Sequence, residues 1–244
     1  MIVSAVPTSG VAAQRRSAST FAVEAALLDI EGTISPLAYV RDVLFPFAAA
    51  RLGAFVRGHG GEPAVAALLD DARRLAGGAD PVAALEAWQR DDVKAPPLKA
   101  LQGLIWAEGY AQGAFSIPIY PDALEAMRRW RGEGLPLYVY SSGSLRAQEL
   151  FFQHSAAGDL RPLFAGRFDA TVGAKTDAAS YARLADRIGA APAAILFCSD
   201  NPAELVAAEA AGLKIAHVVK DGARADPRWP AVGDFSEIVL HPRR

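Results

Sequence analysis

The stretch that decides the fold is VEAALLDIEGT, residues 23–33. Its apolar run, AALL at residues 25–28, ends in Asp29, and Gly32 follows shortly after. An apolar run that stops at a polar residue and a glycine is typical of a parallel strand buried on both faces, which opens into a loop at its carboxyl end. Open α/β sheets bind their ligands at that edge. The stretch therefore predicts a buried strand and also the place of a site.

Three more apolar runs follow along the chain. They are LPLYVY at residues 135–140, AILFC at residues 194–198 and LKIAHVV at residues 213–219. A helical pattern of apolar residues separates each of these runs from the next. Alternation of strands and helices predicts an α/β fold with a parallel sheet that is covered by helices on both faces.

The long segment between the first two runs contains no convincing strand and is rich in Ala, Leu and Arg. It is longer than an ordinary connection between a strand and a helix, so it must form structure of its own. We expect helices near residues 40–57, 62–76, 81–92 and 98–114. Pro46 should kink or divide the first of them. The segment predicts a helical cap domain at residues 36–116, inserted into a core made of residues 23–35 and 117–244.

The composition is that of a globular protein. Of 244 residues, 52% are hydrophobic and 21% are charged, and the formal net charge is −2. These values give no indication of nucleic-acid binding, and no apolar run approaches the ~20 residues that cross a bilayer. Cys198 is the single cysteine, which excludes an internal disulfide and fits a reducing cytoplasm. Residues 1–22 are small, polar and without periodicity, so we expect a disordered extension outside the fold.

The predicted chemistry begins at Asp29 and Glu31. They lie two positions apart after the first strand, so extended backbone directs both carboxylates to the same side. An aspartate before a glycine is also common in ordinary turns, and this pentapeptide alone does not separate the two interpretations.

Two later strands end in polar residues of the kind that bind phosphate or metal. Ser141 and Ser142 follow the second run, in a turn that can present hydroxyl and N–H groups to phosphate, with Ser144 as a helix N-cap. Asp200 follows the third run and can join Asp29 in holding a hard cation through oxygen ligands. Two carboxylates and few histidines favour Mg²⁺ over zinc.

Lys175, in the segment VGAKTD, precedes a predicted helix. Its ammonium group can meet a phosphoryl group, although an isolated lysine is more often a solvated surface charge.

The ordered set Asp29-x-Glu31-Gly-Thr33, Ser141, Lys175 and Asp200 resembles the four motifs of the haloacid-dehalogenase-like phosphohydrolases. Longer strings, LLDIEGT with SPLAYVRDVLFPF, YVYSSGSLRAQELFFQHSAAGDL and RFDATVGAKTDAASYARLA, resemble one branch, the acireductone-forming enolase-phosphatases of methionine salvage. This resemblance spans residues 25–240. It implies a Rossmann-like core with an inserted helical cap, and a monomer as the functional state.

The resemblance also implies roles for the site residues. Asp29 is the expected nucleophile, and Mg²⁺ is the expected cofactor, bound near Asp29, Glu31 and Asp200. Ser141 and Ser142 would hold the substrate, a small phosphorylated diketone of the 2,3-diketo-5-methylthiopentyl-1-phosphate type, and Lys175 would contact its phosphate. We expect Glu31 to act as the acid and base of phosphate transfer. No residue is identified as the base of the enolisation step.

The sequence departs from the family pattern in two places. Ile34 and Ser35 stand where a pair of threonines is common, which removes a hydroxyl near the site. After Asp200 the chain reads NPAEL, and Asn201 with Glu204 fits a helix capping box, which we place ahead of a metal role for Glu204. These changes leave two alternatives open: a Mg²⁺-dependent phosphatase of another small metabolite, and a non-catalytic domain that binds a phosphorylated ligand.

Overall fold

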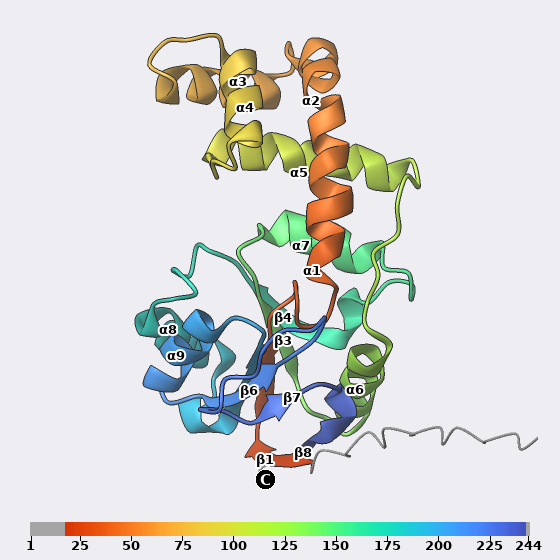
Figure 1. Ribbon diagram of the computed structural model, residues 1–244, viewed down its shortest axis with the longest axis vertical. Coiled ribbons are helices and arrows are strands. Elements are labelled where there is room, and N and C mark those ends of the chain that lie inside the picture. Colours follow the sequence, from red (N-terminus) through yellow and green to blue (C-terminus); the bar gives the residue numbers. More distant parts are fainter. Residues whose placement is uncertain (1–17, 243–244) are drawn as a thin grey trace, which may run out of the picture.

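Six parallel strands form the central sheet of the computed structural model, which describes residues 18–242 (Figure 1). Across the sheet the strands are β4 (Phe164–Phe168), β3 (Leu137–Tyr140), β2 (Ala25–Leu28), β5 (Ile195–Ser199), β6 (Lys214–Val218) and β7 (Ala231–Val232). The stretch that opens the sequence thus provides a central strand, β2, which is buried along its whole length. Parallel strands of this kind need both faces of the sheet covered.

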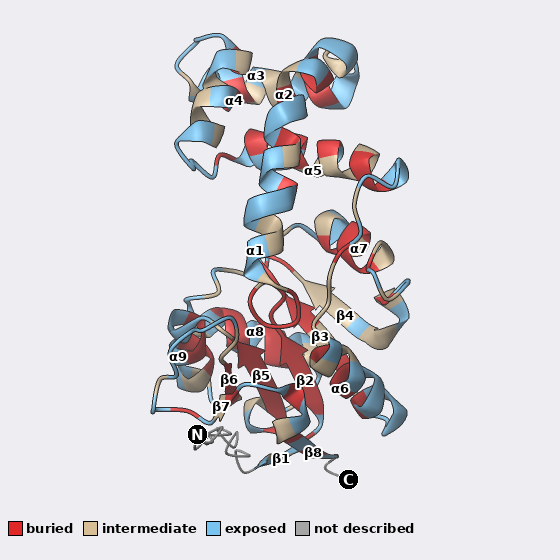
Figure 2. Ribbon diagram, turned by 45° about the vertical axis from the view of Figure 1, so that its right-hand side comes forward, coloured by how far each residue is buried: buried red, intermediate tan, exposed pale blue. Residues whose placement is uncertain are grey.

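Side chains of β2 alternate between two hydrophobic clusters, one on each face of the sheet. Ala26 and Leu28 belong to the cluster that includes side chains of α6 (Pro121–Gly132) and α7 (Leu145–Gln153). Ala25 and Leu27 belong to the cluster that includes side chains of α8 (Ala178–Ile188) and α9 (Pro202–Ala210). The predicted α/β fold with helices on both faces is confirmed, and Figure 2 shows the buried strands between these helices.

The strand register brings the ends of three strands to one edge of the sheet. Leu28 pairs with Val139 of β3 on one side and with Cys198 of β5 on the other. The residues that follow these positions therefore emerge together, which places Asp29 between the loops that begin at Ser141 and Asp200.

A helical region stands between β2 and β3, on the side of this edge (Figure 1). It contains α1 (Leu37–Tyr39), the π-helix η1 (Val40–Leu44), α2 (Phe45–His59), α3 (Pro63–Leu75), α4 (Pro81–Arg90) and α5 (Pro96–Ala111). It has a hydrophobic cluster of its own, in which Leu52, Leu85 and Leu101 are completely or almost completely buried. The four expected helices are present, while the limits of the cap at residues 36 and 116 stay a prediction.

Pro46 lies in the first turn of α2, where the π-helix η1 gives way to an α-helix. Proline has no N–H to donate to the preceding turn, so it favours a change of hydrogen-bond pattern there. The predicted division of this helix is thus found as a change of helix type.

The exclusion of residues 1–22 from the fold is wrong for residues 19–22. Strand β1 (Ser19–Val23) pairs in parallel with β8 (Ile238–Pro242) at the far end of the chain. Local sequence carries no signal for such a distant pairing, and residues 1–17 lie outside the described residues. Strands β4 and β7, at the edges of the main sheet, were also not predicted.

Three short 3-10 turns, η2 (Arg161–Leu163), η3 (Pro192–Ala194) and η4 (Phe235–Glu237), complete the elements. Among the described residues no helix has both the length and the apolar character that crossing a membrane requires. The cytoplasmic location stays a prediction.

Candidate active site

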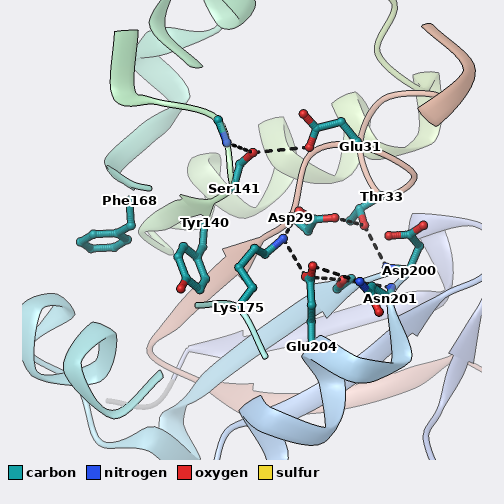
Figure 3. Close-up of polar contacts among 12 residues, drawn as sticks. Asp29, Glu31, Thr33, Tyr140, Ser141, Phe168, Lys175, Asp200, Asn201 and Glu204 are labelled. Atoms are coloured by element: carbon teal, nitrogen blue, oxygen red, sulfur yellow. Dashed lines mark hydrogen bonds and ion pairs between the residues drawn. The ribbon is translucent and has the colours of Figure 1, made fainter. Parts of the chain in front are cut away.

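Asp29 is the first residue after β2 and is 4% exposed. Its main-chain N–H donates to the carbonyl of Cys198 at 3.0 Å, which fixes the residue to the neighbouring strand β5. Its carboxylate is held at both oxygens, because Oδ1 meets the Lys175 ammonium and Oδ2 accepts from Thr33 Oγ1 at 3.3 Å. Figure 3 shows Asp29 at the centre of these contacts.

Thr33 connects Asp29 to Asp200. Its Oγ1 accepts a hydrogen bond from the Asp200 N–H at 3.1 Å while donating to Asp29. Gly32 has φ +78°, and a Cβ at this position would lie 2.2 Å from Asp200 Oδ2. The Asp200 carboxylate therefore rests against the Gly32 backbone, and a glycine is required for both the conformation and the space.

Lys175 lies between Asp29 and Glu204 (Figure 3). Its Nζ is 2.7 Å from Glu204 Oε2, and both side chains are 11% exposed. Glu204 also accepts hydrogen bonds from Ser199 Oγ at 3.1 Å and from Asn201 Nδ2 at 3.3 Å. A network with its hydrogen bonds satisfied in this way fixes the ammonium group beside the Asp29 carboxylate.

The capping box predicted for Asn201 and Glu204 is only partly present, while its comparison with a metal role for Glu204 stays untested. Asn201 does cap α9, since its side chain accepts from the Ala203 N–H at 3.0 Å. The Asn201 N–H, however, donates to Ser199 Oγ and not to Glu204 as a capping box requires. Glu204 lies in the first turn of α9, close in the chain to Asp200, and an acidic residue so near a strand-end carboxylate was the signal in the sequence.

The carboxyl groups of the site repel one another. Burial is the larger cause and the negative charge of Asp29 the second largest, and they raise the pKa of Glu31 to about 7 and that of Asp200 to about 6. The same two causes raise the pKa of Glu204. Burial lowers the pKa of Lys175, but the charges of Asp29 and Glu204 outweigh burial and leave this pKa above its ordinary value. The site therefore holds an excess of negative charge that a bound cation would compensate.

Glu31 and Ser141 form the opposite side of the site. Ser141 is buried, and its Oγ donates to Glu31 Oε2 at 3.4 Å while accepting from the Gly143 N–H at 3.1 Å. Ser142 is exposed, and its carbonyl accepts from Lys99 Nζ of α5 at 3.3 Å. The turn after β3 thus contacts both Glu31 and helix α5 of the helical region.

The predicted metal ligands are only partly brought together. Among residues 18–242 no three His, Cys, Asp or Glu side chains are grouped as a set that could hold a metal ion. Glu31 is directed to Ser141, whereas Asp29 and Asp200 lie on either side of Thr33 and repel each other. Two adjacent strand-end carboxylates are a donor set that fits a hard cation such as Mg²⁺.

The sequence matches a family model described as haloacid dehalogenase-like hydrolase over residues 23–212. It is 55% identical over 217 residues to enolase-phosphatase E1 of Bradyrhizobium sp., covering 89% of this chain and 94% of that protein. It is 50% identical over 223 residues to enolase-phosphatase E1 of Pseudomonas aeruginosa, covering 89% of this chain and 99% of that protein.

The chain belongs to the enolase-phosphatase E1 family. A solved structure, the UTR4 protein of Saccharomyces cerevisiae, is similar with a TM-score of 0.74 and 32% identity, covering 87% of this chain and 98% of that one. Because 87% of this chain is covered, the structural similarity is not limited to the sheet and extends into the helical region.

Proposed function

We propose that this enolase-phosphatase converts 2,3-diketo-5-methylthiopentyl-1-phosphate to the acireductone 1,2-dihydroxy-3-keto-5-methylthiopentene and phosphate, a step of methionine salvage. The observation that carries the proposal is the convergence at one sheet edge of Asp29, Lys175 and Asp200, with Glu31 beside Ser141 on the opposite side of the site. Membership of the enolase-phosphatase E1 family supports this choice of substrate. We also propose that a monomer carries out the reaction, as the resemblance to the family implies.

In the phosphatase step the Asp29 carboxylate attacks phosphorus. The new bond joins a carboxylate oxygen to phosphorus, the bond from phosphorus to the substrate oxygen breaks, and an aspartyl-phosphate remains. Mg²⁺ held by Asp29 and Asp200 would offset the repulsion between the carboxylate and the phosphate. Lys175 already lies against Asp29, where its positive charge can meet the phosphoryl oxygens. Loss of one such donor costs on the order of 3 kcal/mol of transition-state stabilisation.

Glu31 is the acid and base of this proposal. A carboxyl group with a pKa of about 7 is partly protonated near neutral pH, so it can give a proton to the leaving oxygen. The resulting carboxylate then accepts a proton from the water that hydrolyses the aspartyl-phosphate. Ser141, which donates to Glu31 Oε2, orients the group for both transfers.

The enolase step requires removal of a proton next to a carbonyl and stabilisation of the resulting enolate. Glu31 is the candidate base, provided that the substrate shifts between the two steps. Ser141 and the N–H groups of its turn are candidate donors to the enolate oxygen.

The departures at Ile34 and Ser35 do not favour a different substrate. Ile34 is completely buried in the hydrophobic cluster beneath the site, and Ser35 Oγ donates to the carbonyl of Pro118 at 2.7 Å. Neither side chain is free to meet the substrate, so the missing threonine hydroxyl does not by itself change recognition.

The test follows the diketone phosphate by ultraviolet absorbance and by phosphate release in the same sample, with Mg²⁺ and after chelation. We expect the enol product and phosphate together, and neither phosphate nor turnover without Mg²⁺. Phosphate release without an enol product would indicate a phosphatase for another metabolite. Binding of the substrate with no release under any condition would indicate a non-catalytic domain.

A further inference from the structure

The loop that carries Lys175, residues 169–177 between β4 and α8, is neither helix nor strand. Turns within the loop satisfy the carbonyls of Asp169, Ala170 and Ala174, and its other backbone carbonyls need hydrogen-bond donors from elsewhere. Three of them are held by side chains: Val172 O by Arg183 Nε at 2.7 Å, Gly173 O by the Tyr140 hydroxyl at 2.8 Å, and Lys175 O by the Tyr181 hydroxyl at 2.8 Å. Side-chain donors thus fix the loop on both sides of the Lys175 Cα.

The two tyrosines are themselves fixed by the core. Tyr140 ends β3 and Tyr181 lies on α8, and both are completely buried. Their rings meet edge to face, with centroids 5.6 Å apart at 84°. The Tyr181 ring also packs against Phe197 of β5 at 5.1 Å. Because these rings are packed into the sheet, their hydroxyls are rigid points from which the loop is held.

One of the two tyrosine rings also lies near the ammonium group of Lys175. The Lys175 ammonium lies 5.7 Å from the centroid of the Tyr140 ring, in addition to its contacts with Asp29 and Glu204. Gly173 has φ +147°, and a Cβ there would come 2.1 Å from Ser180 Oγ, so the loop is pressed against α8. Both the backbone and the head of Lys175 are therefore placed by buried groups.

We propose that Tyr140 and Tyr181 are positioning residues for Lys175, which hold its main chain so that the ammonium group meets the phosphoryl oxygens in the transition state. This inference rests on the proposed function, in which Lys175 stabilises phosphate transfer. A lysine side chain is long and flexible, so its head is placed reproducibly only when its backbone is fixed. A displacement of about 1 Å at such a group can lower the rate by roughly a hundredfold.

The experiment removes the hydroxyls and keeps the rings. Tyr181→Phe, Tyr140→Phe and the double variant are compared with wild type by kcat, KM and the inhibition constant of orthovanadate, which imitates phosphorus in the transition state. We expect kcat to fall roughly tenfold in each single variant and the orthovanadate inhibition constant to rise by a similar factor. The control is Tyr138→Phe, because Tyr138 lies on the same strand and its hydroxyl makes no hydrogen bond within residues 18–242.

The orthovanadate constant separates positioning from folding. Loss of folded protein lowers kcat but leaves that constant unchanged, so a fall in kcat alone would overturn the inference. Wild-type kcat and inhibition in the double variant would also overturn it. Lys175→Met tests the underlying function: if it keeps wild-type turnover, the role of Lys175 is wrong, whereas an impaired Lys175→Met beside an unimpaired double variant refutes only the positioning by the tyrosines.

Discussion

An ion pair at the sheet edge is buried, whereas an ion pair of the same length in the helical region is exposed to water. At the sheet edge, the ion pair of Lys175 and Glu204 is 2.7 Å long and each side chain is 11% exposed. In α3, Arg73 and Asp70 are also 2.7 Å apart, but their side chains are 51% and 70% exposed. Water screens the attraction between Arg73 and Asp70, whereas it hardly screens the attraction between Lys175 and Glu204. Burial, and not the distance between the charged atoms, therefore distinguishes the ion pair of the site from an ordinary pair on a helix surface.

The largest expected effect comes from Asp29→Asn. The amide cannot act as the nucleophile, so turnover should fall on the order of 10⁴-fold or more, as measured by phosphate release. Asp80→Asn in the helical region is the matched control, since Asp80 caps α4 by accepting from the Ala83 N–H and asparagine caps equally well. Undiminished phosphate release in Asp29→Asn would refute the assignment of the nucleophile.

Gly32→Ala should have the next largest effect. The new methyl group would displace the Asp200 carboxylate, so we expect about a hundredfold loss of kcat and a higher Mg²⁺ concentration for half-maximal activity. Gly78→Ala separates this displacement from backbone strain, because Gly78 also has a positive φ of +93° but lies in open space in the helical region. Equal losses in the two variants would mean that Asp200 is not the cause.

Glu204→Gln should lower kcat about tenfold. Glutamine has nearly the same size but removes the negative charge beside Lys175, which weakens the fixation of the ammonium group. Glu209→Gln, on the same helix and paired with Arg228 away from the site, should leave kcat unchanged. A wild-type kcat in Glu204→Gln would mean that the charge of Glu204 does not contribute to catalysis.

The smallest effect is expected from Arg73→Ala. Removing an exposed ion pair should change the free energy of unfolding by less than about 0.5 kcal/mol and leave kcat unaltered. Urea denaturation and a steady-state assay measure both quantities. A loss above about 1 kcal/mol would show that the contrast between the two regions does not hold.

Much of the fold was predictable because it follows from local patterns. The apolar runs identified β2, β3, β5 and β6, and breaks in the helical pattern identified α2 to α5. The edge strands β4 and β7 were missed because they are short or only half-buried, and such strands lack a continuous apolar run. The pairing of β1 with β8 joins the two ends of the chain and has no local signature.

The sequence by itself determined the identity and order of the polar residues at the strand ends, Asp29, Ser141 and Asp200, because polar residues that end apolar runs mark one edge of a parallel sheet. Only the tertiary structure decided that Glu204 meets Lys175 and that Tyr140 and Tyr181 hold the lysine loop. Periodicity shows which face of an element is buried. It does not show which distant group a buried hydroxyl or carboxylate meets, because that depends on how the helices pack on the sheet.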